Sequence, residues 1–124
     1  MEKQAVVAVV DDDESVRESL PDLLREFGFE PRAFSSAEEF LAAAGLAEVS
    51  CLLLDIGLPG MSGPELQREL IRRGYTIPVV FITGRAEGSI PPGVLQQGEF
   101  RGLFKPFSDR ALRAALDAAL LHRQ

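Results

Sequence analysis

Carboxylates follow two apolar segments of the chain. Asp11 and Asp12 come directly after residues 5–10, and Asp55 comes directly after residues 52–54. The two segments are apolar without alternation, which is typical of strands covered on both faces in a parallel sheet. The carboxyl ends of parallel strands meet at one edge, so we expect these three carboxylates to share a small pocket. Their repulsion favours a bound cation, and hard oxygen ligands in this number suit Mg²⁺.

Two further apolar segments also end on groups with useful chemistry. Residues 78–83 end on Thr83, and Lys105 follows residues 100–104. The lysine adds a positive charge and the threonine adds a hydroxyl donor at the same sheet edge. Both groups suit a phosphoryl group arriving beside the cation.

Five expected strands, of which the second is short and weaker, alternate with five helical segments, and this alternation predicts a doubly wound α/β fold with a five-stranded parallel sheet. The first helix is expected from Ser15 to Phe27, and the third is expected to bury Leu66, Leu70 and Ile71. An irregular fourth helix is expected within residues 85–98. The strands are expected at residues 5–10, 29–34, 50–55, 78–83 and 100–104.

Length and charge narrow the possible classes of protein. The 124 residues are 46% hydrophobic, which predicts a single domain over residues 1–124. The net charge is −6 and Lys/Arg side chains form no stripe, so we expect no direct nucleic-acid binding. The N-terminal apolar run, residues 5–10, is too short for a signal peptide or a membrane span, so a cytoplasmic protein without membrane contact is expected.

Four segments together resemble the receiver domain of two-component response regulators, and the FixJ type within that superfamily. The similarity covers essentially the whole chain, and the order and spacing of the segments make it specific. It implies a flavodoxin-like sheet with strand order 2-1-3-4-5. The segments are Val9–Asp12, Leu54–Gly63, Ile82–Gly84 and Phe104–Phe107.

The resemblance implies a phosphoacceptor rather than an enzyme. Asp55 would take a phosphoryl group from a phosphohistidine of a sensor histidine kinase or phosphotransfer protein. Mg²⁺ or Mn²⁺ would be held by Asp12, Asp55 and the backbone carbonyl of Gly57, with Asp11 acting through water. Catalysis by the chain would be limited to its own phosphorylation and dephosphorylation.

The same resemblance gives roles to the second pair of strand ends. Lys105 would pair with a phosphoryl oxygen, and Thr83 would reorient to hydrogen-bond another. Gly84 would leave the pocket open. The Lys105–Pro106 peptide bond is expected to be cis, as the resemblance implies and proline permits.

Two departures from the family pattern keep an alternative function open. Gly102 stands three residues before the lysine, where the family has its switch aromatic, and by strand alternation neither Phe100 nor Phe104 is expected to replace it. The run 91–93, Pro-Pro-Gly, interrupts the expected fourth helix. The alternative is an interaction module that works without phosphorylation. A phosphatase is disfavoured because Gly57 stands where a second acid would be needed.

The resemblance also extends to partners beyond the kinase. It implies a homodimer that forms on phosphorylation and a C-terminal DNA-binding output domain outside these residues. A regulator that acts alone is the other possibility. Signal transduction through a phosphorelay is therefore the expected setting.

Overall fold

The computed structural model describes residues 4–84 and 102–121. Its strands are β1 (Val6–Val10), β2 (Glu30–Phe34), β3 (Val49–Asp55), β4 (Val79–Thr83) and β5 (Gly102–Phe104). Its helices are α1 (Glu14–Glu26), α2 (Ala37–Ala42), α3 (Gly63–Arg72) and α5 (Asp109–Leu121), with a 3₁₀ turn η1 (Leu46–Glu48). The predicted irregular helix within 85–98, with its Pro-Pro-Gly run, lies outside the described residues.

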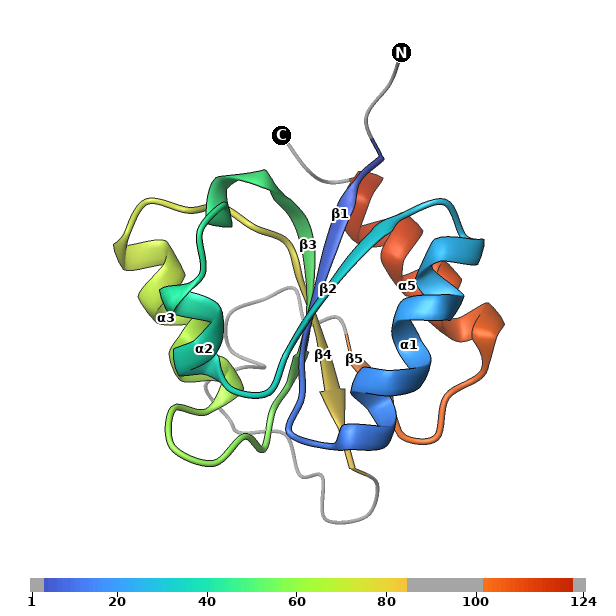
Figure 1. Ribbon diagram of the computed structural model, residues 1–124, viewed down its shortest axis with the longest axis horizontal. Helices are drawn as coiled ribbons and strands as arrows, with labels where there is room; N and C mark the ends of the chain where they lie inside the picture. The colour runs from blue at the N-terminus through green and yellow to red at the C-terminus, as the bar shows by residue number, and fades with distance from the viewer. Residues whose placement is uncertain (1–3, 85–101, 122–124) are drawn as a thin grey trace.

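The five strands form one parallel sheet in the order β2-β1-β3-β4-β5, which confirms the predicted topology. Helices α1 and α5 cover one face, while α2 and α3 cover the other (Figure 1). The carboxyl ends of the strands meet at the lower edge in Figure 1. β3 lies between β1 and β4, so Asp55 stands at the centre of this edge.

The core is divided between the two faces of the sheet. Leu52 and Leu54 of β3 pack on the side of α2 and α3, whereas Cys51 and Leu53 pack on the side of α1 and α5. Every residue of β1, β3 and β4 is buried. Burial on both faces explains why these strands are apolar without alternation.

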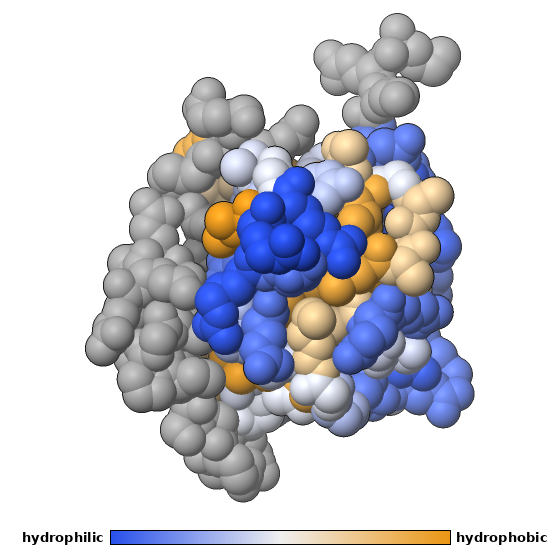
Figure 2. Space-filling view, turned by 90° about the vertical axis from the view of Figure 1, so that its left-hand side faces the viewer, coloured by the Kyte–Doolittle hydropathy of each residue, from blue (hydrophilic) through white to orange (hydrophobic). Residues whose placement is uncertain are grey.

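One prediction about α3 is wrong. Leu66 and Leu70 are buried as expected, but Ile71 is 61% exposed. A helix turns by about 100° per residue, so Ile71 lies far around the axis from the face that Leu66 and Leu70 share. This outer face of α2 and α3 is seen in Figure 2, where hydrophilic side chains gather over its middle beside smaller hydrophobic areas.

None of the helices within the described ranges, 4–84 and 102–121, has the length and apolar character to cross a membrane.

The helices that follow the site loops begin with well-formed caps. Asp13 caps α1 by accepting a hydrogen bond from Ser15 N at 3.0 Å. Ser62 and Glu65 form a reciprocal capping box at the start of α3. These caps fix where α1 and α3 leave the loops that carry the acids.

Gly63 allows α3 to start unusually close to the end of β3. A Cβ atom at this position would lie 2.6 Å from the backbone oxygen of Asp55 and 3.1 Å from the Cα of Ile56. Both neighbours are backbone atoms, so they cannot move aside independently of the strand. The close approach requires glycine for steric reasons.

Gly63→Ala is expected to force the start of α3 away from β3 and to lower the free energy of unfolding by about 1–3 kcal/mol. Gly84→Ala is the matched control, because a Cβ there would meet no atom of residues 4–84 or 102–121 within 4 Å. Urea unfolding of both variants measures the effect. Equal stability of the two variants would show that the contact at Gly63 relaxes without cost.

Candidate functional site

The three predicted carboxylates converge at the carboxyl edge of the sheet. One oxygen atom each from Asp11, Asp12 and Asp55 lies within 4.8 Å of the others. Asp11 and Asp55 are buried, with 0% and 8% exposure, while Asp12 is open to solvent. The pocket is therefore a cluster of acids with one open side.

Asp11 is held through each of its polar groups. Its backbone N–H donates to Phe34 O at 3.1 Å, and its backbone carbonyl accepts from Arg17 Nη1 at 3.1 Å. Its Oδ1 accepts from Asp13 N at 2.9 Å, and its Oδ2 faces Lys105 Nζ at 3.0 Å. These contacts fix the turn from which Asp12 projects.

Arg17 was not found by the sequence analysis. On a helix rich in charged residues, a single arginine is typical of a solvated surface. It stands in the first turn of α1 and reaches back six positions to the carbonyl of Asp11, a contact that hydrophobic periodicity does not predict.

The donor set suits a hard divalent cation. Asp11 Oδ2 is buried and has no well-aligned hydrogen bond within the described part of the chain, although it is close to Lys105. All three side chains in the cluster offer carboxylate oxygens, which Mg²⁺ and Mn²⁺ prefer. The residues present therefore fit the expected ion, and Gly57 lies beside them, with its N–H donating to Asp55 Oδ1 at 3.0 Å.

Asp55 has a perturbed acidity. Burial raises the pKa of its carboxyl to about 6, and the negative charges of Asp11 and Asp12 act in the same direction. The Gly57 N–H and the Lys105 ammonium oppose this rise. At neutral pH the carboxyl is still mainly ionised, but its charge is costly without a cation.

Lys105 lies between two acids. Its Nζ is 3.0 Å from Asp11 Oδ2 and 4.0 Å from Asp13 Oδ2. Burial lowers the pKa of the ammonium, but the interactions with Asp11, Asp55 and Asp13 outweigh this effect and raise the pKa above its usual value. Asp13 therefore both caps α1 and lies close to this lysine.

Thr83 and the end of β5 complete the edge. The Thr83 side chain is buried, and its hydroxyl donates to Gly84 O at 3.2 Å. Lys105 N donates to Thr83 O at 2.9 Å, which ties the two strand ends together. The Lys105–Pro106 peptide bond is cis, in agreement with the expectation from the sequence.

The departure at Gly102 is visible in the strand register. Gly102 pairs with Phe81, whereas Phe104 pairs with Thr83 and is 52% exposed. Gly102, where the resemblance implies a switch aromatic, carries no side chain. The nearest aromatic on β5 among the described residues is half open to solvent.

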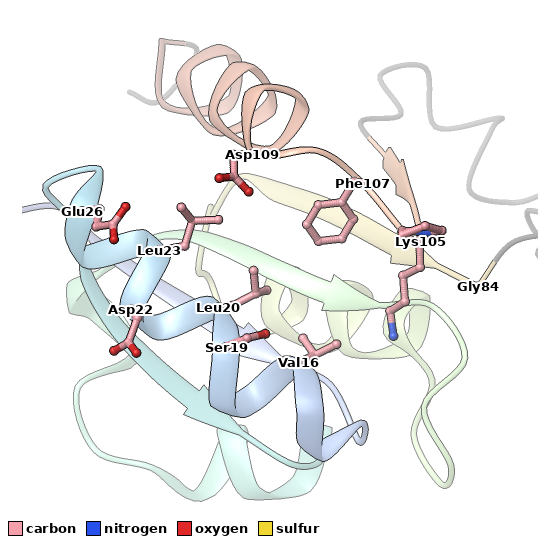
Figure 3. A pocket seen from close by; sticks show the side chains of 11 residues that line it. Val16, Ser19, Leu20, Asp22, Leu23, Glu26, Gly84, Lys105, Phe107 and Asp109 are labelled. Carbon is pink, nitrogen blue, oxygen red and sulfur yellow. The ribbon is translucent and has the colours of Figure 1, made fainter.

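A cavity of about 870 Å³ adjoins the site on the α1 side. Figure 3 shows Leu20 and Leu23 of α1 on one side of it, Phe107 on the other, and Lys105 at one end. Acidic side chains at its rim come from Asp22, Glu26 and Asp109. The sequence analysis did not find this cavity, because its two walls are far apart along the chain. Its apolar lining lies close to the lysine.

The fold and the site together define a flavodoxin-like α/β domain with an acid cluster and a lysine at the carboxyl edge of its sheet. The family description "Response regulator receiver domain" matches residues 7–117. The chain belongs to this family of two-component signalling domains.

Curated relatives support this assignment. The chain is 43% identical over 116 residues to nodulation protein W of Bradyrhizobium diazoefficiens, covering 94% of this chain and 51% of the relative. It is 38% identical over 120 residues to the transcriptional regulatory protein FixJ of Azorhizobium caulinodans, covering 97% and 57%. The chain thus spans about half the length of these relatives.

Solved structures agree with the fold. The response regulator StyR superposes with a TM-score of 0.87 at 40% identity, covering 98% of this chain and 61% of StyR. The structure titled FixJ-N gives 0.82 at 36% identity, covering 99% and 98%. The resemblance to FixJ-type receivers is confirmed.

Asp55→Asn is expected to stabilise the metal-free fold at neutral pH. The carboxyl has an ordinary pKa of 3.8 and a folded-state pKa of about 6, so the folded protein binds this proton more tightly than the unfolded chain. The ionised group therefore destabilises the fold above about pH 6, and this effect disappears as the pH falls towards 3.8.

We expect the free energy of unfolding of Asp55→Asn to exceed that of the wild type by about 1–3 kcal/mol at pH 7.5. The difference should shrink towards zero near pH 4. Urea unfolding in the presence of a chelator measures it. A difference that stays constant with pH would contradict the raised pKa of Asp55.

Proposed function

We propose that this chain is a Mg²⁺- or Mn²⁺-dependent phosphoacceptor, in which Asp55 takes a phosphoryl group from a partner histidine kinase or phosphotransfer protein. The observation that carries this proposal is the convergence of Asp55 with Asp11, Asp12 and Lys105 in one pocket. Membership of the receiver family supports the choice of chemistry.

In the proposed transfer, a carboxylate oxygen of Asp55 attacks the phosphorus atom of a phosphohistidine. The new O–P bond forms as the N–P bond breaks, and the imidazole nitrogen keeps the electron pair. Lys105 exchanges its contact with Asp11 Oδ2 for a phosphoryl oxygen, and Thr83 turns its hydroxyl from Gly84 O to another. Charge in such a transition state is spread over the phosphoryl oxygens, so positioned cations supply most of the catalysis.

The divalent cation, when bound, supplies positive charge beside the phosphoryl oxygens. Asp12, Asp55 and the Gly57 carbonyl would hold it, with Asp11 acting through water. Ionisation of Asp55 is required for attack, and its pKa of about 6 leaves it mainly ionised at neutral pH. The catalysis proposed for the chain is limited to acceptance and later hydrolysis of its own phosphoryl group.

The proposed partners follow from the site and from the length of the relatives. The cavity beside Lys105 offers an apolar surface for the donor protein. The chain covers about half of each curated relative, which supports a C-terminal DNA-binding output domain outside these residues. We place this signalling in the cytoplasm, with dimerisation on phosphorylation as one output and no direct contact of these residues with nucleic acid or membrane.

A second candidate function is a receiver-like interaction module that does not depend on phosphorylation. The observation that favours it is Gly102, which leaves no aromatic side chain at the usual switch position. Unchanged partner affinity after complete modification of Asp55 would support this candidate.

Incubation with a small acyl phosphate is expected to add a single phosphoryl group to the wild-type chain in the presence of Mg²⁺. Asp55→Asn should remain unmodified, and so should the wild type in excess chelator. Intact-mass spectrometry measures the product. Modification of Asp55→Asn to the same extent would place the acceptor elsewhere and contradict the proposal.

Leu23→Ala is expected to lower kcat/KM for transfer from the cognate phosphorylated kinase by about 3- to 10-fold, because apolar contact in the cavity is lost. The rate with a small acyl phosphate should stay within about twofold, since that donor does not need the cavity. Leu121→Ala removes a leucine that is 79% exposed on α5 and is the control. An equal loss with both donors would instead indicate damage to the pocket.

A further inference from the structure

We propose that Glu38 of α2 is a positioning residue for the metal-binding loop that follows Asp55. This inference rests on the proposed function, because it assigns a purpose to the loop between β3 and α3. It concerns a side chain that lies outside the acid cluster and was not among the predicted site residues.

Glu38 makes a direct contact with this loop. Its Oε2 accepts a hydrogen bond from the backbone N–H of Met61 at 3.1 Å. The same carboxylate lies over Gly60, where a Cβ would approach Oε2 to 3.0 Å. Gly60 has a φ of +73°, a conformation that favours glycine. The Glu38 carboxylate therefore lies close against the turn at Gly60, where a larger residue would crowd it.

The helix that carries Glu38 is well anchored despite its short length. Ala37 and Phe40 are fully buried, and the Ser36 hydroxyl caps the helix by accepting from Glu39 N at 3.0 Å. Phe40 belongs to the same apolar cluster as Leu58 of the loop. Glu38 therefore extends from an anchored helix to the loop, and Leu58 of the loop belongs to the same apolar cluster as that helix.

The other side-chain hydrogen bonds to this loop are local. Gly57 N donates to Asp55 Oδ1, and Ser62 N donates to Glu65 Oε1, so both remain within β3, the loop and the start of α3. The contact from Glu38 spans 23 positions of the sequence. Within the described ranges, it is the hydrogen bond that ties residues 57–61 to a separate helix.

The loop begins at Gly57, whose carbonyl is a proposed ligand of the cation. Gly57 is exposed, and apart from its chain neighbours the described residues would bring only Asp55 Oδ1 near a Cβ on it, at 3.9 Å. Packing around Gly57 therefore does little to fix the direction of its carbonyl. Restraint at Met61 limits the conformations open to the loop, so the carbonyl is ordered before the ion arrives. Loss of this restraint should weaken ion binding more than it slows the transfer at saturating ion.

The test compares Glu38→Ala with two matched variants. Glu38→Gln removes the charge but keeps an oxygen that can accept from Met61 N. Glu39→Ala removes the neighbouring carboxylate of α2, whose contacts are to Ser35 N and Ser35 Oγ and not to the loop. Mn²⁺ affinity is measured by electron paramagnetic resonance titration, and phosphoryl acceptance from a small acyl phosphate is measured at varied Mg²⁺.

Glu38→Ala is expected to weaken Mn²⁺ affinity by about 3- to 10-fold, the loss of one hydrogen bond that orders a ligand. It should raise the Mg²⁺ concentration for half-maximal acceptance by a similar factor, with the maximal rate within about twofold. Glu38→Gln and Glu39→Ala should both stay within about twofold of the wild type in affinity.

Three results would overturn the proposal: unchanged affinity in Glu38→Ala, an equal loss in Glu38→Gln, or an equal loss in Glu39→Ala. The second would show that charge alone matters, and the third that α2 is merely destabilised. If the wild type bound Mn²⁺ but accepted no phosphoryl group, the proposed function would fail. The affinity comparison would still decide the role of Glu38.

Discussion

The arrangement of the site depends on like charges held together at the end of a buried sheet. Asp11 directly follows β1 and Asp55 ends β3, so both are buried with these strands, and their repulsion is only partly offset by Lys105. Burial of this kind is unfavourable unless a cation is present. The acid pocket thus lowers the stability of the fold, and the two apolar cores on either side of the sheet must compensate for this loss.

Supports for the pocket come from several elements. Arg17 of α1 donates to the carbonyl of Asp11, and Phe34 of β2 accepts from its N–H. Lys105 comes from the turn directly after β5. On the opposite side, α3 packs against Asp55 through Gly63. The acids and the lysine lie at strand ends, but contacts from helices on both faces of the sheet help to fix their positions.

The sheet and the acid cluster could be predicted from the sequence, because residues that follow the strands of a parallel sheet meet at one edge of it. The apolar segments before Asp11 and Asp55 predicted two strands of this sheet, and their parallel arrangement predicted that the acids lie close together. Arg17 and Glu38 could not be found in this way, since neither follows an apolar strand and each contacts a backbone atom of a turn, 6 and 23 positions away along the chain. The exposure of Ile71 was missed because it was assigned to the same helix face as its neighbour Leu70, although adjacent residues of a helix point in directions about 100° apart. The cavity was missed because its walls meet only after folding.

The central place of β3 has a consequence for how the domain responds to a change at Asp55. This strand is paired on both edges and buried along its whole length, so its amide protons should exchange with solvent only when the whole domain opens. Added charge at such a strand end cannot be relieved by local fraying. Under the proposed function, a charge added at Asp55 would therefore act first on the charged side chains around the strand end, Asp11, Asp12 and Lys105.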